Sequence, residues 1–319
     1  MAVINVTGGS TGDVGSTAAT LINALQADLL EVVKFNTVLE QLFDSVPLTN
    51  AKTMQWNRLE RRSVATTPSQ LTEGVNPNAV GLQINSITAT IEEYGERYFI
   101  AELAELSAKN GIVQETMKTA AYAMAETRAR LLYTVADAAT NVQRVNGRAS
   151  DNAIAIGDTW SFHEIAEVVS ILAGNGVPRY PGDAYRMVLP SHLYYSISVD
   201  PNWGSTRQFS RSADIDRGYV GQLHGADIIK VVDNSFTLTI SGTTGNSDSI
   251  YSGFVAGPGF AKVTDMGGRQ LYLDAPGSGD DTLRLYYKVG WKMRMKGVLT
   301  NQGFGRRLRA SGNNAGSAP

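Results

Sequence analysis

Three histidines are the side chains in this sequence best suited to bind a metal ion or to transfer protons near neutral pH. His163, His192 and His224 do not form an HExxH motif, and no spacing between them presents two imidazoles to one metal ion. The glycines near the N-terminus do not fit the phosphate-binding pattern GxxxxGK[ST], and no GxSxG motif is present. The histidines are therefore interpreted as surface or helix-end residues.

Two adjacent acidic pairs are the remaining candidates for acid–base chemistry. Glu92 and Glu93 lie in a predicted strand, where neighbouring side chains point to opposite faces, so they cannot converge on one substrate. Asp280 and Asp281 lie in a glycine-rich loop that lacks the calcium-loop pattern. The sequence thus predicts a protein that is not an enzyme, with no catalytic residue, metal site or cofactor. A metal-dependent hydrolase that uses the Asp280 loop stays as an alternative.

The most regular pattern in the sequence runs from Leu283 to Leu299. Apolar and polar residues alternate over this stretch, which predicts one long strand with an apolar face and a cationic face. The cationic face carries Arg284, Lys288, Lys292, Arg294 and Lys296. Because like charges about 7 Å apart repel each other, these cations require counter-charges from another chain, solvent or nucleic acid.

Inter-subunit ion pairs are the preferred interpretation of these cations, with Glu73, Glu92 or Glu96 of a neighbouring copy as partners. Protection of an edge strand against wrong pairing and direct contact with DNA are the alternatives. A second basic group lies beside the C-terminal tail, and its residues are likewise candidates for contact between subunits. It comprises Arg306, Arg307 and Arg309.

The composition limits the class of protein. The chain has 319 residues, of which 43% are hydrophobic, so it can bury a substantial core. A formal net charge of −2 gives no overall basic field for DNA binding, and the absence of cysteine excludes disulfides and thiolate chemistry. No apolar run is long enough for a transmembrane helix, and the first residues do not resemble a secretion signal. Glycine-, serine- and threonine-rich stretches at both ends predict flexible arms.

Hydrophobic periodicity predicts the elements that position these side chains. Helices are expected over Thr17–Val46 and Ile112–Val142, the second on the order of 45 Å long. Strands are expected over Thr53–Arg62 and Gln83–Tyr98. Between residues 150 and 281 the sequence indicates a mixed region, which contains the following elements: a helix capped by Ser161, a strand over Tyr185–Leu189, a helix from Ser191, and strands over Ala226–Val232 and Phe236–Ile240.

The two strands between residues 53 and 98 form a long β-arm, because a turn-rich loop of about twenty residues joins them. An isolated hairpin is marginally stable in water, and this one has few large apolar residues of its own. We therefore expect the arm to lie on another surface, either of its own chain or of a neighbour. Trp56, Leu71 and Val75 are the apolar groups expected to be buried there, as candidates for contact with a neighbouring copy.

The order of these parts resembles the Hong Kong 97-type fold of tailed-bacteriophage major capsid proteins. Within that fold, several segments resemble the branch related to the coliphage N-four capsid protein. These segments are TTPSQLTEGVNPNAVGLQINSITATIEEYGE (66–96), ATNVQRVNGRAS (139–150), YRMVLPSHLYYSISVDPNW (185–203), RGYVGQLHGADIIKV (217–231) and VGWKMRMKGVL (289–299). They are spread over most of the chain from about residue 52 to residue 299.

The resemblance implies an α+β capsid fold with five parts. These are an N-terminal arm and helix (1–51), a β-hairpin extension loop (52–100), a peripheral domain with a spine helix (101–149), a mixed α/β axial domain (150–282), and a closing peripheral strand with a C-terminal arm (283–319). It implies a structural protein that assembles into hexamers and pentamers to form an icosahedral shell around double-stranded DNA. An encapsulin-like nanocompartment shell, which has the same fold and holds protein cargo, is the alternative.

The resemblance also implies the partners and the location of the protein. The main partner is the chain itself, and a scaffolding protein, a portal and a cement or decoration protein are further partners. Packaged double-stranded DNA would lie close to the shell without specific recognition, and no membrane is involved. The expected location is the virion, and the host cytoplasm during assembly.

Overall fold

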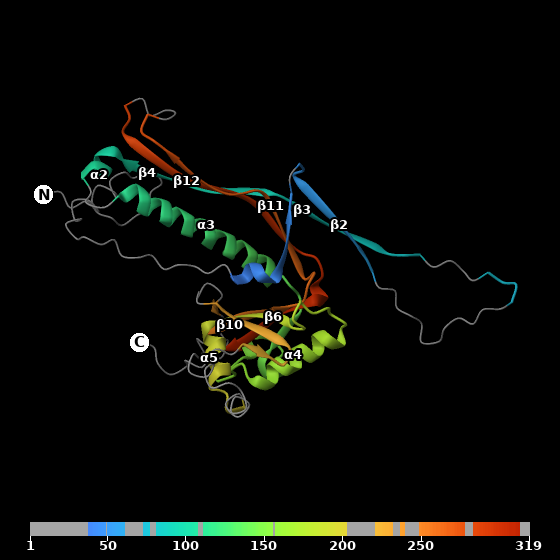
Figure 1. Cartoon of the computed structure of the whole chain (residues 1–319). Coiled ribbons are helices and arrows are strands. Elements are labelled where there is room, and N and C mark those ends of the chain that lie inside the picture. Colours follow the sequence, from blue (N-terminus) through green and yellow to red (C-terminus); the bar gives the residue numbers. More distant parts are fainter. Residues whose placement is uncertain are drawn as a thin grey trace.

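The computed structural model describes residues 38–312 apart from 49, 61–72, 77–80, 108–110, 156, 203–220, 232–236, 240–248 and 278–282. The predicted N-terminal arm, most of the predicted first helix, Leu71 and the Asp280 loop therefore lie outside the described residues. Within them the chain forms three β-sheets and four α-helices (Figure 1). The helices are α2 (Glu102–Ser107), α3 (Ile112–Asp137), α4 (Phe162–Gly174) and α5 (Ser191–Val199), with short 3-10 turns that include η1 (Val38–Leu42) and η5 (Gln302–Phe304).

A four-stranded sheet forms the elongated part of the molecule. Its strand order is β1 (Phe43–Pro47), β11 (Ala261–Asp274), β12 (Tyr286–Leu299) and β4 (Glu92–Ala101). The alternation predicted for the long C-terminal strand is confirmed along β12, where Val289, Trp291, Met293 and Met295 are at most 3% exposed. These side chains pack under α3, which lies along one face of the sheet (Figure 1).

Helix α3 has the place predicted for the spine helix but is shorter. It ends at Asp137 instead of Val142, and its 26 residues give a length of about 39 Å. The residues that follow it turn into strand β5 (Val142–Arg144), which pairs with β13 (Gly305–Ser311). The helical pattern of the sequence thus extends beyond Asp137, but pairing of the following residues with β13 ends the helix there.

Residues 43–46, which the sequence predicts as the end of a helix, form strand β1, so that part of the prediction is wrong. Phe43–Pro47 pairs in parallel with Ala261–Asp265 of β11. Leu42, Phe43 and Val46 fit helical spacing, but the edge of β11 supplies backbone partners to this segment. Tertiary pairing therefore overrides the local pattern.

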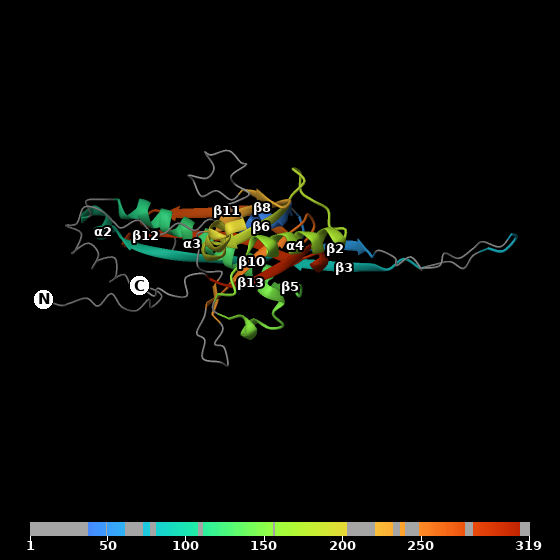
Figure 2. The same cartoon turned by 90° about the horizontal axis from the view of Figure 1, so that it is seen from below.

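The β-arm is confirmed as an antiparallel pair of β2 (Thr53–Leu59) and β3 (Ile84–Thr90). It extends away from the rest of the molecule in Figure 1, and Figure 2 shows its two strands side by side. The single strand predicted over Gln83–Tyr98 is divided at Ile91, which is 6% exposed and donates its N–H to the Lys52 carbonyl oxygen at 2.9 Å. Before Ile91 the chain pairs with β2, and after it the chain pairs with β12.

A second sheet of seven strands forms the other lobe. Its order is β5, β13, β10 (Ser249–Ala256), β6 (Tyr185–Pro190), β8 (Ala226–Val231) and β7 (Gln222–Leu223), and β9 (Thr237–Thr239) pairs with β10. Helices α4 and α5 pack on one face, around a core that includes Trp160, Ile165 and Leu172, each 0% exposed. The other face contributes Val188 and Phe254 to the core under α3.

The predicted cap of α4 is confirmed, because the Ser161 hydroxyl oxygen accepts the N–H of Glu164 at 3.5 Å. The Glu164 side chain does not form the second hydrogen bond of a capping box, to the backbone of Ser161. Its carboxylate accepts the backbone N–H of Asn146 at 2.7 Å, and its second oxygen is buried without a partner. Burial raises the pKa of Glu164 above its usual value.

Strands β10, β11 and β13 were not predicted from the sequence. Strand β11 falls within residues 150–282, yet it pairs with β12 of the four-stranded sheet. Strand β13 falls within residues 283–319, yet it pairs with β10 and β5 of the seven-stranded sheet. The chain therefore crosses between the two sheets more often than its sequence pattern indicates.

Candidate assembly surface

The arm carries exposed apolar side chains far from either core. Leu59 and Ile84 lie opposite each other on β2 and β3 and are 58% and 62% exposed. Leu82 and Val75 are also exposed, as is Glu73, which lies in a turn beyond the strands. Large apolar groups with this exposure cost free energy in water, so the arm is suited to contact another surface.

The base of the arm is fixed to the body by Arg58. Its Nη1 donates to the carbonyl oxygen of Thr300 at 2.8 Å, while Nε and Nη2 donate to one carboxylate oxygen of Glu60 at 3.0 and 2.5 Å. Asn85 on β3 donates to the same oxygen at 2.7 Å. Hydrogen bonds from Arg58 and then Asn85 lower the pKa of Glu60. Arg58 thus connects both strands of the arm to the end of β12.

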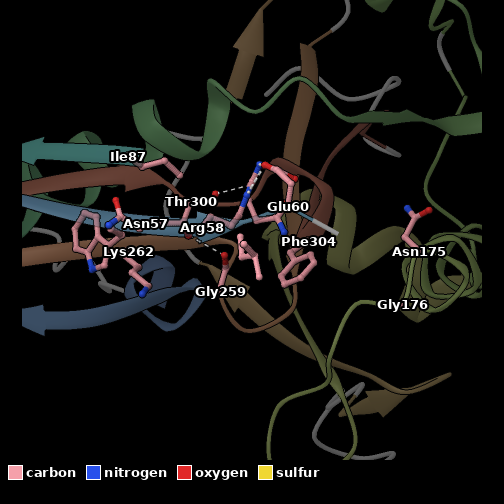
Figure 3. Close-up of a pocket in the computed structure, with 13 residues that line it drawn as sticks. Asn57, Arg58, Glu60, Ile87, Asn175, Gly176, Gly259, Lys262, Thr300 and Phe304 are labelled. Carbon is pink, nitrogen blue, oxygen red and sulfur yellow. Dashed lines mark hydrogen bonds and ion pairs between the residues drawn. The ribbon is translucent and has the colours of Figure 1, made fainter. Parts of the chain in front are cut away.

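A cavity of about 520 Å³ lies between the base of the arm and the body (Figure 3). Trp56, Arg58 and Ile87 line it from the arm, and Lys262 and Phe304 line it from the body. The ammonium group of Lys262 lies 5.5 Å from the centre of the Trp56 ring, a cation–π contact within the chain. Trp56, expected to contact a neighbour, is half-buried and already contacts its own body.

The cations of β12 find counter-charges on β4 of the same chain. Arg294 pairs with Glu93 at 3.1 Å, Lys292 also pairs with Glu93, and Lys296 pairs with Glu92 at 2.5 Å. The antiparallel register of β4 and β12, which places Arg294 opposite Glu93, brings these groups together. The expectation that their counter-charges come from outside the chain is therefore wrong for these three cations.

The acidic side chains of β4 also bind tyrosines. Tyr94 donates to Glu92, Tyr98 donates to Glu96 at 2.8 Å, and the Trp291 indole N–H donates to Glu96 at 3.3 Å. Hydrogen bonds from Lys296 and then Tyr94 lower the pKa of Glu92. Burial, followed by the bonds to Glu92 and Glu96, raises the pKa of Tyr94 and of Tyr98 to about 12.

Arg284 and Lys288 differ from the other three cations. Arg284 precedes β12 in a turn with a φ of 56°, so it does not belong to the cationic face of the strand. Its side chain lies against Gly277, where a Cβ atom would come within 2.9 Å of it. Lys288 lies on β12 opposite Phe99 and is half-buried.

The basic group near the C-terminus lies inside the molecule. Arg309 is 1% exposed and donates to the Asp137 carboxylate at 2.7 Å, and Arg307 donates to the Asp137 carbonyl oxygen at 2.6 Å. Arg306 donates to Gln143 at 3.1 Å. These bonds join β13 to the end of α3 and to β5. Burial removes Arg309 from the candidate contact surface, which corrects the expectation that it contacts a neighbouring copy.

Sequence reasoning missed a buried ion network at the centre of α3. Arg128, 3% exposed, binds both carboxylate oxygens of Asp265 at 2.6 and 2.9 Å and Glu40 at 2.5 Å. Arg269 also binds Glu40, at 3.2 Å. Arg128 lies four residues after Met124 and four before Leu132, inside the apolar stripe of the helix. A cation in that position indicates a buried, paired charge.

The histidines have aromatic neighbours. His192 stacks on Tyr251 with ring centres 4.4 Å apart, and His224 meets Phe162 edge-on at 4.2 Å. Within the described part of the chain, no group of three or more histidine and acidic side chains is placed to hold a metal ion. None of the described helices is long and apolar enough to cross a membrane.

No protein-family model and no curated protein sequence matches this chain. Solved structures do. The capsid of Helicobacter pylori bacteriophage KHP30 aligns with 89% of this chain and 94% of its own, at 12% identity and a TM-score of 0.69. The capsid of cyanophage P-SCSP1u aligns over 90% and 92%, at 14% identity and a TM-score of 0.67. The capsid of Ralstonia phage GP4 aligns over 91% and 95%, at 13% identity and a TM-score of 0.66.

The chain has a phage capsid fold. The similarity extends over about nine-tenths of each chain, so it includes both sheets and not one shared motif. At these identities the comparison establishes the mixed α+β fold alone. The surface contacts of this chain must therefore be argued from its own residues.

Proposed function

We propose that this chain is the major capsid protein of a tailed bacteriophage, with the Hong Kong 97-type fold. Copies of it assemble into hexamers and pentamers that form an icosahedral shell around double-stranded DNA. The observation that carries the proposal is the alignment with phage capsids over about 90% of both chains. The exposed apolar side chains of the arm support it, because they require a surface that a single copy does not provide.

In this proposal the parts of the chain have separate roles. Residues 52–100 are the extension loop, which reaches across an adjacent copy, and Glu73 and Val75 lie on its exposed part. The four-stranded sheet, which includes β11, and helix α3 supply the peripheral domain. The seven-stranded lobe, which includes β5 and β13, supplies the axial domain at the centre of each capsomer. Cohesion comes from many modest contacts, as expected for a multivalent assembly.

The proposed location is the virion, after assembly in the host cytoplasm. A scaffolding protein, a portal and a cement or decoration protein are the proposed further partners, and packaged DNA lies near the shell. The role is structural and requires no catalysis and no cofactor. The paired charges on β4 and β12 fit this role, because their bonds within one chain hold the sheet together instead of binding a substrate.

Expression of the full chain, alone and with a scaffolding protein, tests the proposal. Sedimentation and negative-stain electron microscopy should reveal closed shells, tubes or capsomer rings. A chain that stays monomeric under both conditions would contradict the proposal. Particles isolated from their natural source should contain double-stranded DNA, whereas protein cargo would favour an encapsulin-like compartment.

A further inference from the structure

Strand β4 is a long edge strand with one side unpaired among the described residues. It contributes ten residues to the sheet and pairs only with β12. The Glu102 N–H donates to the Leu285 carbonyl oxygen at 2.8 Å in the same register, so even-numbered residues bond to β12. The backbone N–H and C=O groups of Glu93, Gly95, Arg97 and Phe99 therefore point away from the sheet.

The other edges of the two larger sheets, as far as the structure describes them, are shorter: β9 has three residues, and β11 has six, residues 269–274, that lie beyond its pairing with β1. Strand β1 has five residues and ends at Pro47, β5 has three residues and β7 has two. Short strands and proline are the means by which proteins prevent unwanted pairing at a sheet edge. Strand β4 has neither, since it is ten residues long and contains no proline. Among these edges it is the one suited to accept another strand.

Charged side chains are the other common means of protecting a sheet edge. On β4 these side chains bind residues of their own sheet. Glu93 pairs with Arg294, and Glu92 pairs with Lys296, both on β12. Glu96 accepts hydrogen bonds from Tyr98 and Trp291. These contacts direct the three carboxylates back over the sheet, so they do not repel a strand that approaches the backbone.

Arg97 is the remaining charged side chain of β4. Its guanidinium lies 4.9 Å from the centre of the Phe99 ring, two residues along the same strand. Each charged side chain of β4 is therefore engaged by its own chain. The outer edge presents backbone donors and acceptors without a free charge in front of them.

We propose that the outer edge of β4 pairs with an extended strand of a second copy of this chain. This inference rests on the proposed function, which supplies identical copies at high local concentration. The arm of each copy offers such a strand, because β2 and β3 form a two-stranded sheet that extends away from the body. A chain with a donor strand and a separate acceptor edge makes heterologous contacts, which close into rings.

Amide hydrogen exchange on the wild-type chain tests the pairing. Particles assembled from the purified chain alone are compared with unassembled subunits, so a new partner strand can only come from another copy. The amides of Glu93, Gly95, Arg97 and Phe99 should exchange at least tenfold more slowly in particles. The amides of Tyr94, Glu96 and Tyr98 should be protected in both samples.

Two exchange results would overturn the inference. One is equally fast exchange of the outward amides in subunits and particles, and the other is slow exchange already in subunits. A chain that forms no particles by sedimentation, either alone or with a scaffolding protein, overturns the proposed function and this inference with it. Normal particles with unprotected outward amides overturn the inference alone, so the two failures are distinguishable.

A pair of variants at one position provides the second test. Arg97→Ala removes the side chain and keeps the outward N–H, while Arg97→Pro removes both. Proline is tolerated on an edge strand where the N–H faces solvent, so both variants should fold. Arg97→Pro should give at least tenfold fewer particles than Arg97→Ala. Equal particle yields from two folded variants would contradict the pairing, and the exchange experiment decides the matter if Arg97→Pro does not fold.

Discussion

The seven-stranded lobe and the arm of this molecule use their apolar residues in opposite ways. In the lobe, Trp160, Ile165 and Leu172 are 0% exposed between the sheet and its two helices. In the arm, Leu59 and Ile84 are 58% and 62% exposed, although each lies next to the other. The lobe buries its core side chains within one copy and leaves only Tyr195 and Val199 of α5 largely exposed among its described large apolar residues, whereas the arm buries neither Leu59 nor Ile84.

This difference indicates that the lobe contributes to the folding of one copy and the arm to assembly of several copies. Burial of the lobe core stabilises a single copy, because each fully buried large side chain contributes about 1.5–3 kcal/mol. The arm gains little from its own two strands and is attached to the body mainly at its base. Substitutions in the lobe should therefore lower the stability of the subunit, and substitutions in the arm should lower assembly.

The largest expected effect is at Trp160, in the lobe. Trp160→Ala leaves a large cavity in a packed core and should lower the free energy of unfolding by about 3–5 kcal/mol. Trp160→Phe is the matched control, since it fills much of the space and removes an indole N–H that has no partner. Urea unfolding of the subunit measures both. An alanine variant as stable as the phenylalanine variant would show that the lobe does not depend on this core.

The buried ion network of α3 should give the next largest effect. Arg128→Ala leaves Asp265 and Glu40 without their main counter-charge and should cost about 3–5 kcal/mol. Arg130→Ala, two residues along the same helix, removes an exposed i,i+4 pair with Glu126 and should cost about 0.3–0.5 kcal/mol. Thermal unfolding of the two variants compares them. Equal losses of stability in the two variants would mean that the contribution of Arg128 does not depend on its burial.

Arg58 should affect the position of the arm more than the stability of the body. Arg58→Ala removes the bond to the Thr300 carbonyl oxygen and should cost about 1 kcal/mol at most, while the strands of the arm exchange amide hydrogens faster. Arg58→Lys keeps a donor and should retain part of the protection. Hydrogen exchange of Thr53–Leu59 in unassembled subunits measures the difference. Unchanged exchange in Arg58→Ala would show that the arm is held by other contacts.

Glu164 gives the lobe a pH dependence opposite in sign to that of Glu60 at the base of the arm, whose pKa is lowered. The folded-state pKa of Glu164 is raised, so its contribution to stability is complete below the unfolded pKa and is lost as the pH rises through the folded pKa. Glu164→Gln has no such group to ionise. The variant should therefore have a higher melting temperature than the wild type at neutral pH. The difference between the two melting temperatures should shrink as the pH falls towards 4.5. A difference that is constant with pH would contradict a raised pKa.

The sequence predicted the elements whose pattern is local. The alternation of β12 and the cap of α4 at Ser161 need only neighbouring residues to be recognised, and both are confirmed. The hairpin of β2 and β3 was also recognised, because two strand patterns enclose one turn-rich loop.

The elements that were missed depend on distant partners. Phe43–Pro47 is a strand because β11, more than two hundred residues later, offers it an edge. β11 itself contains Gly267 and Gly268, both with positive φ at a bulge, and these interrupt its strand pattern. Arg309 belongs to a basic group beside the C-terminal tail, and only the fold brings Asp137 and the surrounding sheet to bury it. For the same reason, the counter-charges on β4 could not be assigned from spacing alone.

A double variant of the arm tests most directly whether folding and assembly are separate. Leu59→Ser with Ile84→Ser changes two exposed residues, so the melting temperature of the subunit should change little, consistent with a cost of about 0.5 kcal/mol per site or less. Sedimentation velocity of the same sample should show that rapidly sedimenting particles are lost. A normal yield of particles, or a subunit that melts well below the wild type, would contradict the account.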